Sequence, residues 1–242
     1  KALFVEKPPC AALEQLDRLI ETAKAVGNPA VTVGFQRRFS PVASLLQQEL
    51  RGTKMHSYHY RFLTGAYPEG DALTDLFIHP LDLVSFLFGE AKVRNFTQTG
   101  KSARGEVTLF LVLEHRQVMG CLELSTAYTW KPAVETLEIN TQSGIYRTNC
   151  TDALDYTEKF STFFGLPTEK VFRRTNLTRH LLDNDGFAPT ATSHSIVKQG
   201  FLGEVLDFAR RTEGKMSGTS PASLENVRPT FVIIDEIRQL MD

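Results

Sequence analysis

Three side chains that exchange protons lie close together in one apolar stretch of the chain. Asp75, His79 and Asp82 occur within residues 70–89, a segment that otherwise consists mostly of apolar residues. Their spacing of four and then three residues places them on one face of a helix. Buried carboxylates and imidazoles are costly unless they are paired or face a wet cavity. Two interpretations therefore stay open: a core histidine with two capping aspartates, or an acid/base pair that faces a cleft.

The helix that carries these residues has a marked end and an irregular start. Gly89 follows the last apolar residue, and glycine is the usual residue just past a helix end. Pro80 lacks a backbone N–H and its ring clashes with the carbonyl of Leu76 in a regular helix. We therefore predict that the regular helix begins near His79 and that Asp75 lies in the turn entering it.

Composition limits the classes of partner. The 242 residues are 42% hydrophobic and 23% charged, which is typical of a globular protein with a core. A net charge of −1 gives no reason to expect nucleic acid or an anionic membrane as a partner, and no segment reads as a membrane span or signal peptide. The three cysteines, Cys10, Cys121 and Cys150, form no paired motif, and the histidines have no metal-ligand spacing. We expect a reducing, cytoplasmic setting and no metal.

The first 39 residues read as one strand–helix–strand unit. Residues 2–5 are an apolar run, residues 13–26 have helical periodicity that ends at Gly27, and residues 31–35 form a second strand. This order predicts two parallel strands with a right-handed crossover. A two-stranded parallel sheet needs neighbours on its edges and faces. Because the chain starts in an apolar strand at Lys1, we expect further sequence upstream.

Residues 40–242 predict a second, larger unit of the α+β class. Ser40 and Pro41 form a helix start, with the serine as N-cap. Strands are expected at 54–63, 93–97, 107–114, 118–126, 135–140 and 144–148, near 156–162 and near 171–175, and closing helices at 201–211 and 223–241. This pattern predicts a large, mostly antiparallel open sheet with helices on one face.

The other face of that sheet is expected to be apolar. Leu109, Leu111 and Leu113 share one side of their strand, and we expect them on this uncovered face. An uncovered apolar sheet face is a protein–protein interface. We therefore predict a homodimer or tetramer that packs sheet to sheet.

Four motifs in sequence order resemble those of one enzyme family. They are Glu6-Lys7-Pro8, the run from Val33 to Pro41, the Asp75/His79/Asp82 segment, and the run from Gly203 to Phe208. Together they resemble the glucose–fructose oxidoreductase, inositol dehydrogenase and MocA family of NAD(P)-dependent oxidoreductases. The resemblance implies that residues 1–39 are the C-terminal remnant of a dinucleotide-binding Rossmann domain. It implies that residues 40–242 form the substrate-binding and oligomerisation domain.

The resemblance also implies roles for individual residues. Catalytic residues would be Lys7, Asp75 and His79; cofactor-binding residues Glu6, Lys7, Pro8 and Arg37; and substrate-binding residues Arg38, Asp75, His79 and Trp130. Structural alternatives stay open for several of them: a solvated lysine at Lys7, a solvated or ion-paired arginine at Arg37 or Arg38, and a packed loop aromatic at Trp130. His194 is read as a surface or capping histidine.

These residue types suit the oxidation of an alcohol. Histidine accepts a hydroxyl proton near neutral pH. A lysine beside it hydrogen-bonds the developing alkoxide. The resemblance therefore implies an NAD- or NADP-dependent dehydrogenase of a sugar, cyclitol or related polyol, and leaves open which substrate and which cofactor.

Three departures from the family pattern support an alternative function. Phe77 stands where the family has glycine, Pro80 is unusual, and no Gly-x-Gly-x-x-Gly loop is present to hold a pyrophosphate. This chain is therefore expected to bind a dinucleotide weakly. The alternative is a non-enzymatic sensor, regulator or assembly protein that retains the fold.

Overall fold

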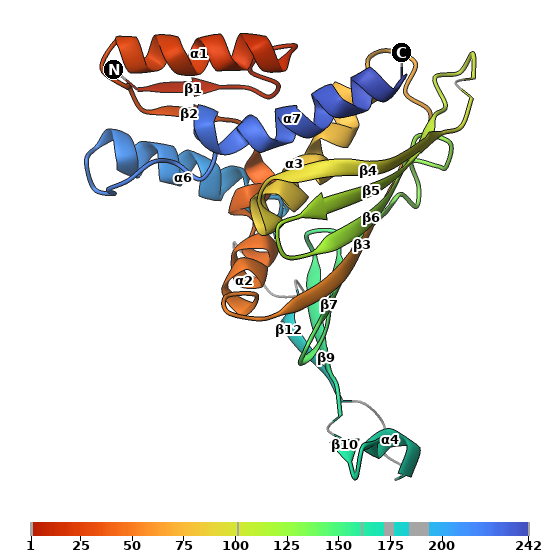
Figure 1. Ribbon diagram of the computed structural model, residues 1–242. Coiled ribbons are helices and arrows are strands. Elements are labelled where there is room, and N and C mark those ends of the chain that lie inside the picture. The colour runs from red at the N-terminus through yellow and green to blue at the C-terminus, as the bar shows by residue number, and fades with distance from the viewer. Residues whose placement is uncertain (1, 101, 161, 172–176, 184–193, 242) are drawn as a thin grey trace.

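A small parallel βαβ unit stands beside a large twisted sheet, with further helices between them (Figure 1). The computed structural model describes residues 2–100, 102–160, 162–171, 177–183 and 194–241. The βαβ unit consists of β1 (Leu3–Val5), α1 (Leu13–Ala25) and β2 (Val31–Val33), with β1 and β2 parallel. The buried side chains of α1 recur at Leu16, Ile20 and Ala23, on one face. The predicted strand–helix–strand unit is confirmed.

Two short helices lead from this unit into the sheet. A 3-10 turn, η1 (Gln36–Phe39), is followed by α2 (Pro41–Glu49). The backbone N–H of Ala43 donates to the Ser40 hydroxyl over 3.1 Å, so Ser40 is the N-cap that the sequence predicts.

The large sheet has eight strands in the order β12-β9-β8-β7-β3-β6-β5-β4. Their bounds are β3 (Met55–Leu63), β4 (Ala91–Gln98), β5 (Thr108–His115), β6 (Met119–Ser125), β7 (Val134–Thr141), β8 (Gly144–Asn149), β9 (Ala153–Glu158) and β12 (Thr178–Asp183). Strands β3 and β6 run parallel, and the other neighbouring pairs are antiparallel. The predicted open, mostly antiparallel sheet is confirmed.

Helices cover one face of this sheet (Figure 1). A π-helical turn, η2 (Leu73–Phe77), continues into α3 (Ile78–Phe88), and α7 (Leu224–Met241) packs against α3, α1 and β4. The helix α6 (Phe201–Thr212) lies against η1. The backbone N–H of Val93 on the edge strand β4 donates to the Glu236 carboxylate of α7 over 2.6 Å, so α7 also covers part of that edge.

The assignment of three leucines to the uncovered face is wrong. Leu109, Leu111 and Leu113 are only 1%, 2% and 0% exposed and belong to the core beneath the helices. The alternate side chains of β5, such as Phe110 and Val112, therefore point to the face without helices. Strand periodicity alone separates the two faces but does not say which one the helices cover.

The segment after β9 is irregular. It contains β10 (Thr162–Phe163), β11 (Leu166–Pro167), α4 (Thr168–Val171) and α5 (Ser195–Lys198). Of the strand expected near 171–175, Val171 lies in α4 and the other positions lie outside the described residues. The strand β12 was not predicted. The His194 imidazole caps α5 by accepting from the Ile196 N–H, which confirms its capping role.

No described helix is long and apolar enough to cross a bilayer. Within the described ranges, no group of three or more histidine, cysteine, aspartate or glutamate side chains is arranged to hold a metal ion.

Candidate active site

Lys7 connects the small βαβ unit to the central helix. It lies just past the C-terminal end of β1, and its side chain is half-buried. Its Nζ donates a hydrogen bond of 2.8 Å to the backbone carbonyl oxygen of Asp75. The sequence predicts that Lys7 and Asp75 share one site, and the structure brings them together across 68 residues of chain.

The Asp75 carbonyl lies in a π turn at the start of the central helix. Residues Leu73–Phe77 are π-helical and the α-helix begins at Ile78, close to the start near His79 that the sequence predicts. Pro80 has no N–H, so the carbonyl of Leu76 in this turn lacks its regular helical donor. Lys7 donates to the preceding carbonyl, that of Asp75, in the same turn.

The carboxylate of Asp75 points to the start of the helix. It accepts a 3.1 Å hydrogen bond from the backbone N–H of Asp71, and it also interacts with the Tyr67 hydroxyl. Space is tight here, since a Cβ at Gly70 would lie 2.3 Å from Asp75 Oδ2. The carboxylate therefore has a capping role, as in the structural alternative for this residue.

His79 is held in its neutral form. Burial lowers the pKa of His79 well below its usual value of 6.5, and the positive charges of Arg37 and Lys7 lower it further. Burial also lowers the pKa of Lys7, while the charges of Asp75 and Glu6 oppose that shift. A neutral imidazole beside a cationic lysine is the state that a proton acceptor needs.

Arg37 lies on the sheet side of this group. Its guanidinium pairs with the Glu135 carboxylate and lies over the Phe62 ring, 5.4 Å from the ring centroid. The ion-paired alternative for Arg37 is thus what the structure shows, and its predicted contact with a cofactor stays a prediction.

Arg38 does not face a cleft, and its expected place among the substrate-binding residues is corrected. Its side chain is 2% exposed and forms a bidentate ion pair with Asp82, whose side chain is 1% exposed. The same guanidinium donates to the backbone carbonyls of Pro221 and Asn226, and Asp82 also accepts from Thr230. Asp82 therefore does not share a polar site with Asp75 and His79. It stabilises the contact between η1, α3 and α7 instead.

The two aromatic residues singled out in the sequence lie in different environments. Phe77 is fully buried and packs edge-on against Phe62, with ring centroids 6.3 Å apart, so it belongs to the core. Trp130 is 52% exposed, lies against Gly65, and donates from Nε1 to the carbonyl of Ala66 over 3.2 Å. Trp130 thus covers the start of the loop that leads through Tyr67 toward Asp75, and its substrate contact stays a prediction.

The ends of β1 and β2 form the carboxyl edge of the small parallel sheet. Glu6, Lys7 and Pro8 follow β1, and Gly34 follows β2, so these residues lie at the carboxyl ends of two parallel strands. Ligands of open parallel sheets bind at this edge. Gly34 is packed closely, since a Cβ there would lie 3.2 Å from Glu6 Oε2. The cofactor roles of Glu6, Lys7 and Pro8 stay predictions.

Sequence reasoning missed Tyr67, Glu135 and Glu204. Tyr67 lies in a loop eight residues before Asp75, and Glu135 lies at a strand start far from residues 75–79 in sequence; no local pattern marks either residue. Glu204 lies in the run from Gly203 to Phe208 that the motif comparison singled out, but its burial follows only from the contact of α6 with η1.

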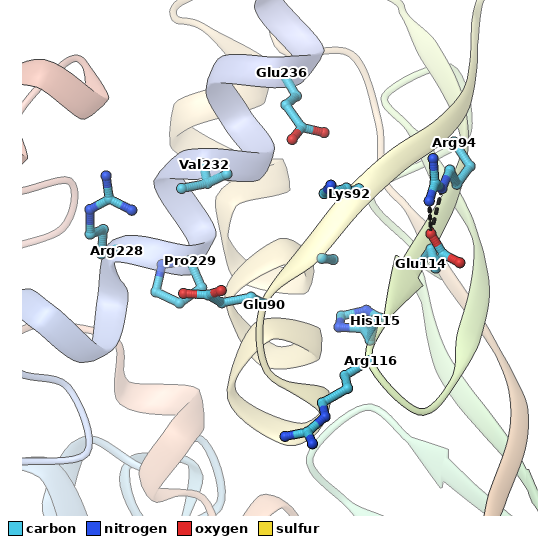
Figure 2. A pocket seen from close by; sticks show the side chains of 11 residues that line it. Glu90, Lys92, Arg94, Glu114, His115, Arg116, Arg228, Pro229, Val232 and Glu236 are labelled. Carbon is cyan, nitrogen blue, oxygen red and sulfur yellow. Dashed lines mark hydrogen bonds and ion pairs between the residues drawn. The ribbon is translucent and has the colours of Figure 1, made fainter.

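A separate groove of about 450 Å³ lies between α7 and the β4–β5 edge (Figure 2). Glu236 on α7 and Lys92 on β4 project into it, and Arg94 pairs with Glu114 on its far wall. Neither Lys7 nor His79 lines this groove.

Two inositol dehydrogenases show sequence similarity to the chain. Inositol 2-dehydrogenase from Acidothermus cellulolyticus is 38% identical over 95 residues, which cover 36% of this chain and 28% of that protein. Inositol 2-dehydrogenase 2 from Saccharopolyspora erythraea is 31% identical over 126 residues, 47% of this chain and 37% of that protein. The matched region thus spans about a third of these relatives. No family model matches the chain.

Solved structures of oxidoreductases share the fold along nearly the whole chain. A dehydrogenase from Chromobacterium violaceum superposes with a TM-score of 0.77 at 17% identity, covering 99% of this chain and 69% of that one. A Gfo/Idh/MocA family oxidoreductase from Vibrio cholerae has a TM-score of 0.70 at 20% identity. The match covers 98% of this chain and 70% of that one. A 3-ketoreductase from Actinomadura kijaniata, solved with NADP, has a TM-score of 0.70 at 15% identity. The match covers 99% of this chain and 69% of that one.

Proposed function

Because the chain belongs to the glucose–fructose oxidoreductase, inositol dehydrogenase and MocA family, we propose that it carries the proton-transfer site of an NAD(P)-dependent dehydrogenase. The substrate would be a cyclitol, sugar or related polyol, in keeping with the named activity of the two inositol dehydrogenases. One observation carries this proposal: Lys7 is fixed to the Asp75 carbonyl beside a neutral His79.

In this proposal His79 accepts the hydroxyl proton of the substrate. The imidazole is neutral because burial, Arg37 and Lys7 all disfavour its charged form. The Lys7 ammonium donates to the substrate oxygen as negative charge develops on it, because its remaining N–H groups are free of the Asp75 bond. The nicotinamide, when bound, supplies the hydride acceptor. The Asp75 carbonyl orients Lys7, and the Asp75 carboxylate supports its charge.

One feature supports the alternative, a sensor or regulator that binds a polyol without turning it over. The Asp75 carboxylate is already engaged by the Asp71 N–H and Tyr67, so it is less available to a substrate. A sensor would bind the polyol at the same residues and would show no hydride transfer.

Hydride transfer in the full-length protein separates the two functions. The assay follows NADH or NADPH absorbance with myo-inositol and a panel of cyclitols and aldoses. We expect turnover with at least one polyol, a loss of about 10²–10⁴ in turnover for His79→Ala, and a comparable loss for Lys7→Met. The matched control is Lys92→Met, an exposed lysine in the separate groove, which should leave turnover unchanged. Binding of a polyol in calorimetry with no turnover under any of these conditions would favour the sensor.

A further inference from the structure

Glu135 is held at the start of β7 by side chains from three other segments. Its Oε1 pairs with the Arg37 guanidinium of η1 and accepts a 2.8 Å hydrogen bond from the Tyr60 hydroxyl of β3. Its Oε2 accepts a 3.6 Å contact from the Cys150 thiol, and the Cys150 backbone N–H donates to the Glu135 carbonyl over 2.7 Å. None of these residues touches the reacting atoms in the proposed mechanism.

The buried pair faces the helix that carries His79. Arg37, Glu135, Tyr60 and Cys150 line a cavity of about 10 Å³, and Leu83 of α3 lines it as well. Leu83 lies one turn after His79, on the same face of the helix. The side chains of Arg37 and Glu135 are only 16% and 12% exposed, so their charges are poorly screened by water.

We infer that Glu135 is a positioning residue of the proton-transfer site: it fixes the Arg37 guanidinium beside His79 and balances its charge. Without Glu135, the cation beside the imidazole is uncompensated. Without Arg37, the imidazole loses a neighbouring cation. Substitutions at the two positions should therefore shift the protonation of His79 in opposite directions.

The charged and titratable groups around this unit come from every packed segment. They are Glu6 and Lys7 after β1, Arg37 in η1, Tyr60 in β3, Asp75 in η2, His79 in α3, Glu135 in β7 and Cys150 after β8. Since Lys7 and Asp75 remain in every variant below, their contributions cancel in the comparison.

Histidine NMR on the full-length protein tests the inference without a substrate. The chemical shift of the His79 ring is followed from pH 8 downward. In Arg37→Gln the midpoint of protonation should rise by about 0.5–1 pKa unit. In Glu135→Gln protonation should begin at a lower pH than in the wild type. A general loosening of the site would instead raise the midpoint in both variants, because water would reach the ring.

Two further variants serve as controls. Glu138 lies on the same strand and pairs with Arg147 at the exposed surface, so Glu138→Gln should leave the His79 titration unchanged. If Glu135→Gln fails to fold, Tyr60→Phe is the alternative, because it removes one of the hydrogen bonds to Glu135. It should shift the pH at which His79 protonation begins in the same direction, by a smaller amount. Two results would overturn the inference. One is an equal shift of the His79 midpoint in Glu135→Gln and Glu138→Gln. The other is a shift of the same sign in Arg37→Gln and Glu135→Gln.

The catalytic relevance of Glu135 rests on the proposed function, but the NMR result does not. Opposite shifts of His79 with no turnover on any polyol would support the positioning role and reject the dehydrogenase. Turnover that is lost in His79→Ala, together with an unshifted His79 in Glu135→Gln, would support the dehydrogenase and reject the positioning role.

Discussion

The neutral state of His79 predicts the pH dependence of the reaction. Its pKa is lowered well below 6.5 by burial and then by Arg37 and Lys7. The imidazole therefore stays a competent base as the pH falls through 6.5, where an unperturbed histidine would be half protonated. We expect kcat/KM for the oxidation to be flat from pH 8 to 6.5 and to fall only at lower pH. A half-maximal rate at or above pH 6.5 would contradict this, and Arg37→Gln should move the acid limb upward.

Glu204 predicts a second pH effect, on stability. It is 3% exposed, its Oε1 has no hydrogen-bond partner among the described residues, and burial, followed by Glu6 and Asp82, raises its pKa from 4.5 to about 8. Between these values the folded state binds more protons than the unfolded state. This group therefore makes the protein less stable as pH rises from 4.5 to 8, by at most about 1.4 kcal/mol per pH unit.

Glu204→Gln should remove that slope. The variant should be more stable than the wild type at pH 8, and the advantage should vanish by pH 4.5, as measured by urea unfolding at several pH values. Glu213→Gln is the matched control, since Glu213 is exposed at the end of the same helix. The same stability difference at pH 5 and pH 8 would show that Glu204 does not titrate as described.

At the scale of elements, the Arg38–Asp82 pair should determine how η1, α3 and α7 stay together. Arg38→Met leaves the Asp82 carboxylate buried with Thr230 alone, so we expect a loss of about 3–5 kcal/mol in the free energy of unfolding. The double variant Arg38→Met/Asp82→Leu removes both charges, so its free energy of unfolding should fall less than that of Arg38→Met. Denaturant unfolding of the wild type, Arg38→Met, Asp82→Leu and the double variant measures this. A double variant as unstable as the sum of the two single variants would mean that the pair does not act as a unit.

Local sequence rules predicted the elements better than their pairing. The Ser40 cap, the βαβ unit and the helix ending at Gly89 depend on neighbours in sequence, and all three appear as expected. The burial of Leu109 and the pairing of Arg38 depend on where distant helices pack, which no local pattern encodes. Pro80 illustrates both cases: the irregular helix start that it causes was predictable, but the Lys7 bond to the Asp75 carbonyl in that turn is a tertiary contact.

At the scale of the whole molecule, the face of the sheet without helices bears a strip of exposed apolar side chains flanked by ion pairs. Phe110 and Met119 are each 46% exposed and lie opposite Glu123 and Glu114, and Val112 pairs in register with Cys121 between them. Figure 1 shows no helix on this side of β5 and β6. The sheet-to-sheet interface stays a prediction, with different residues from the three leucines that strand periodicity suggested.

We expect two copies to pack through this strip about a two-fold axis, because a self-complementary face closes on itself as a dimer. A stable interface buries about 1,600 Å² in total, so one buried charge at its centre should be disruptive. Phe110→Lys should therefore turn a dimer into a monomer in size-exclusion chromatography with light scattering at about 10 µM. Leu240→Lys is the control, because Leu240 is 52% exposed on α7, away from the strip, and should leave the mass unchanged. A monomeric wild type, or a dimer that persists in Phe110→Lys, would rule out this interface.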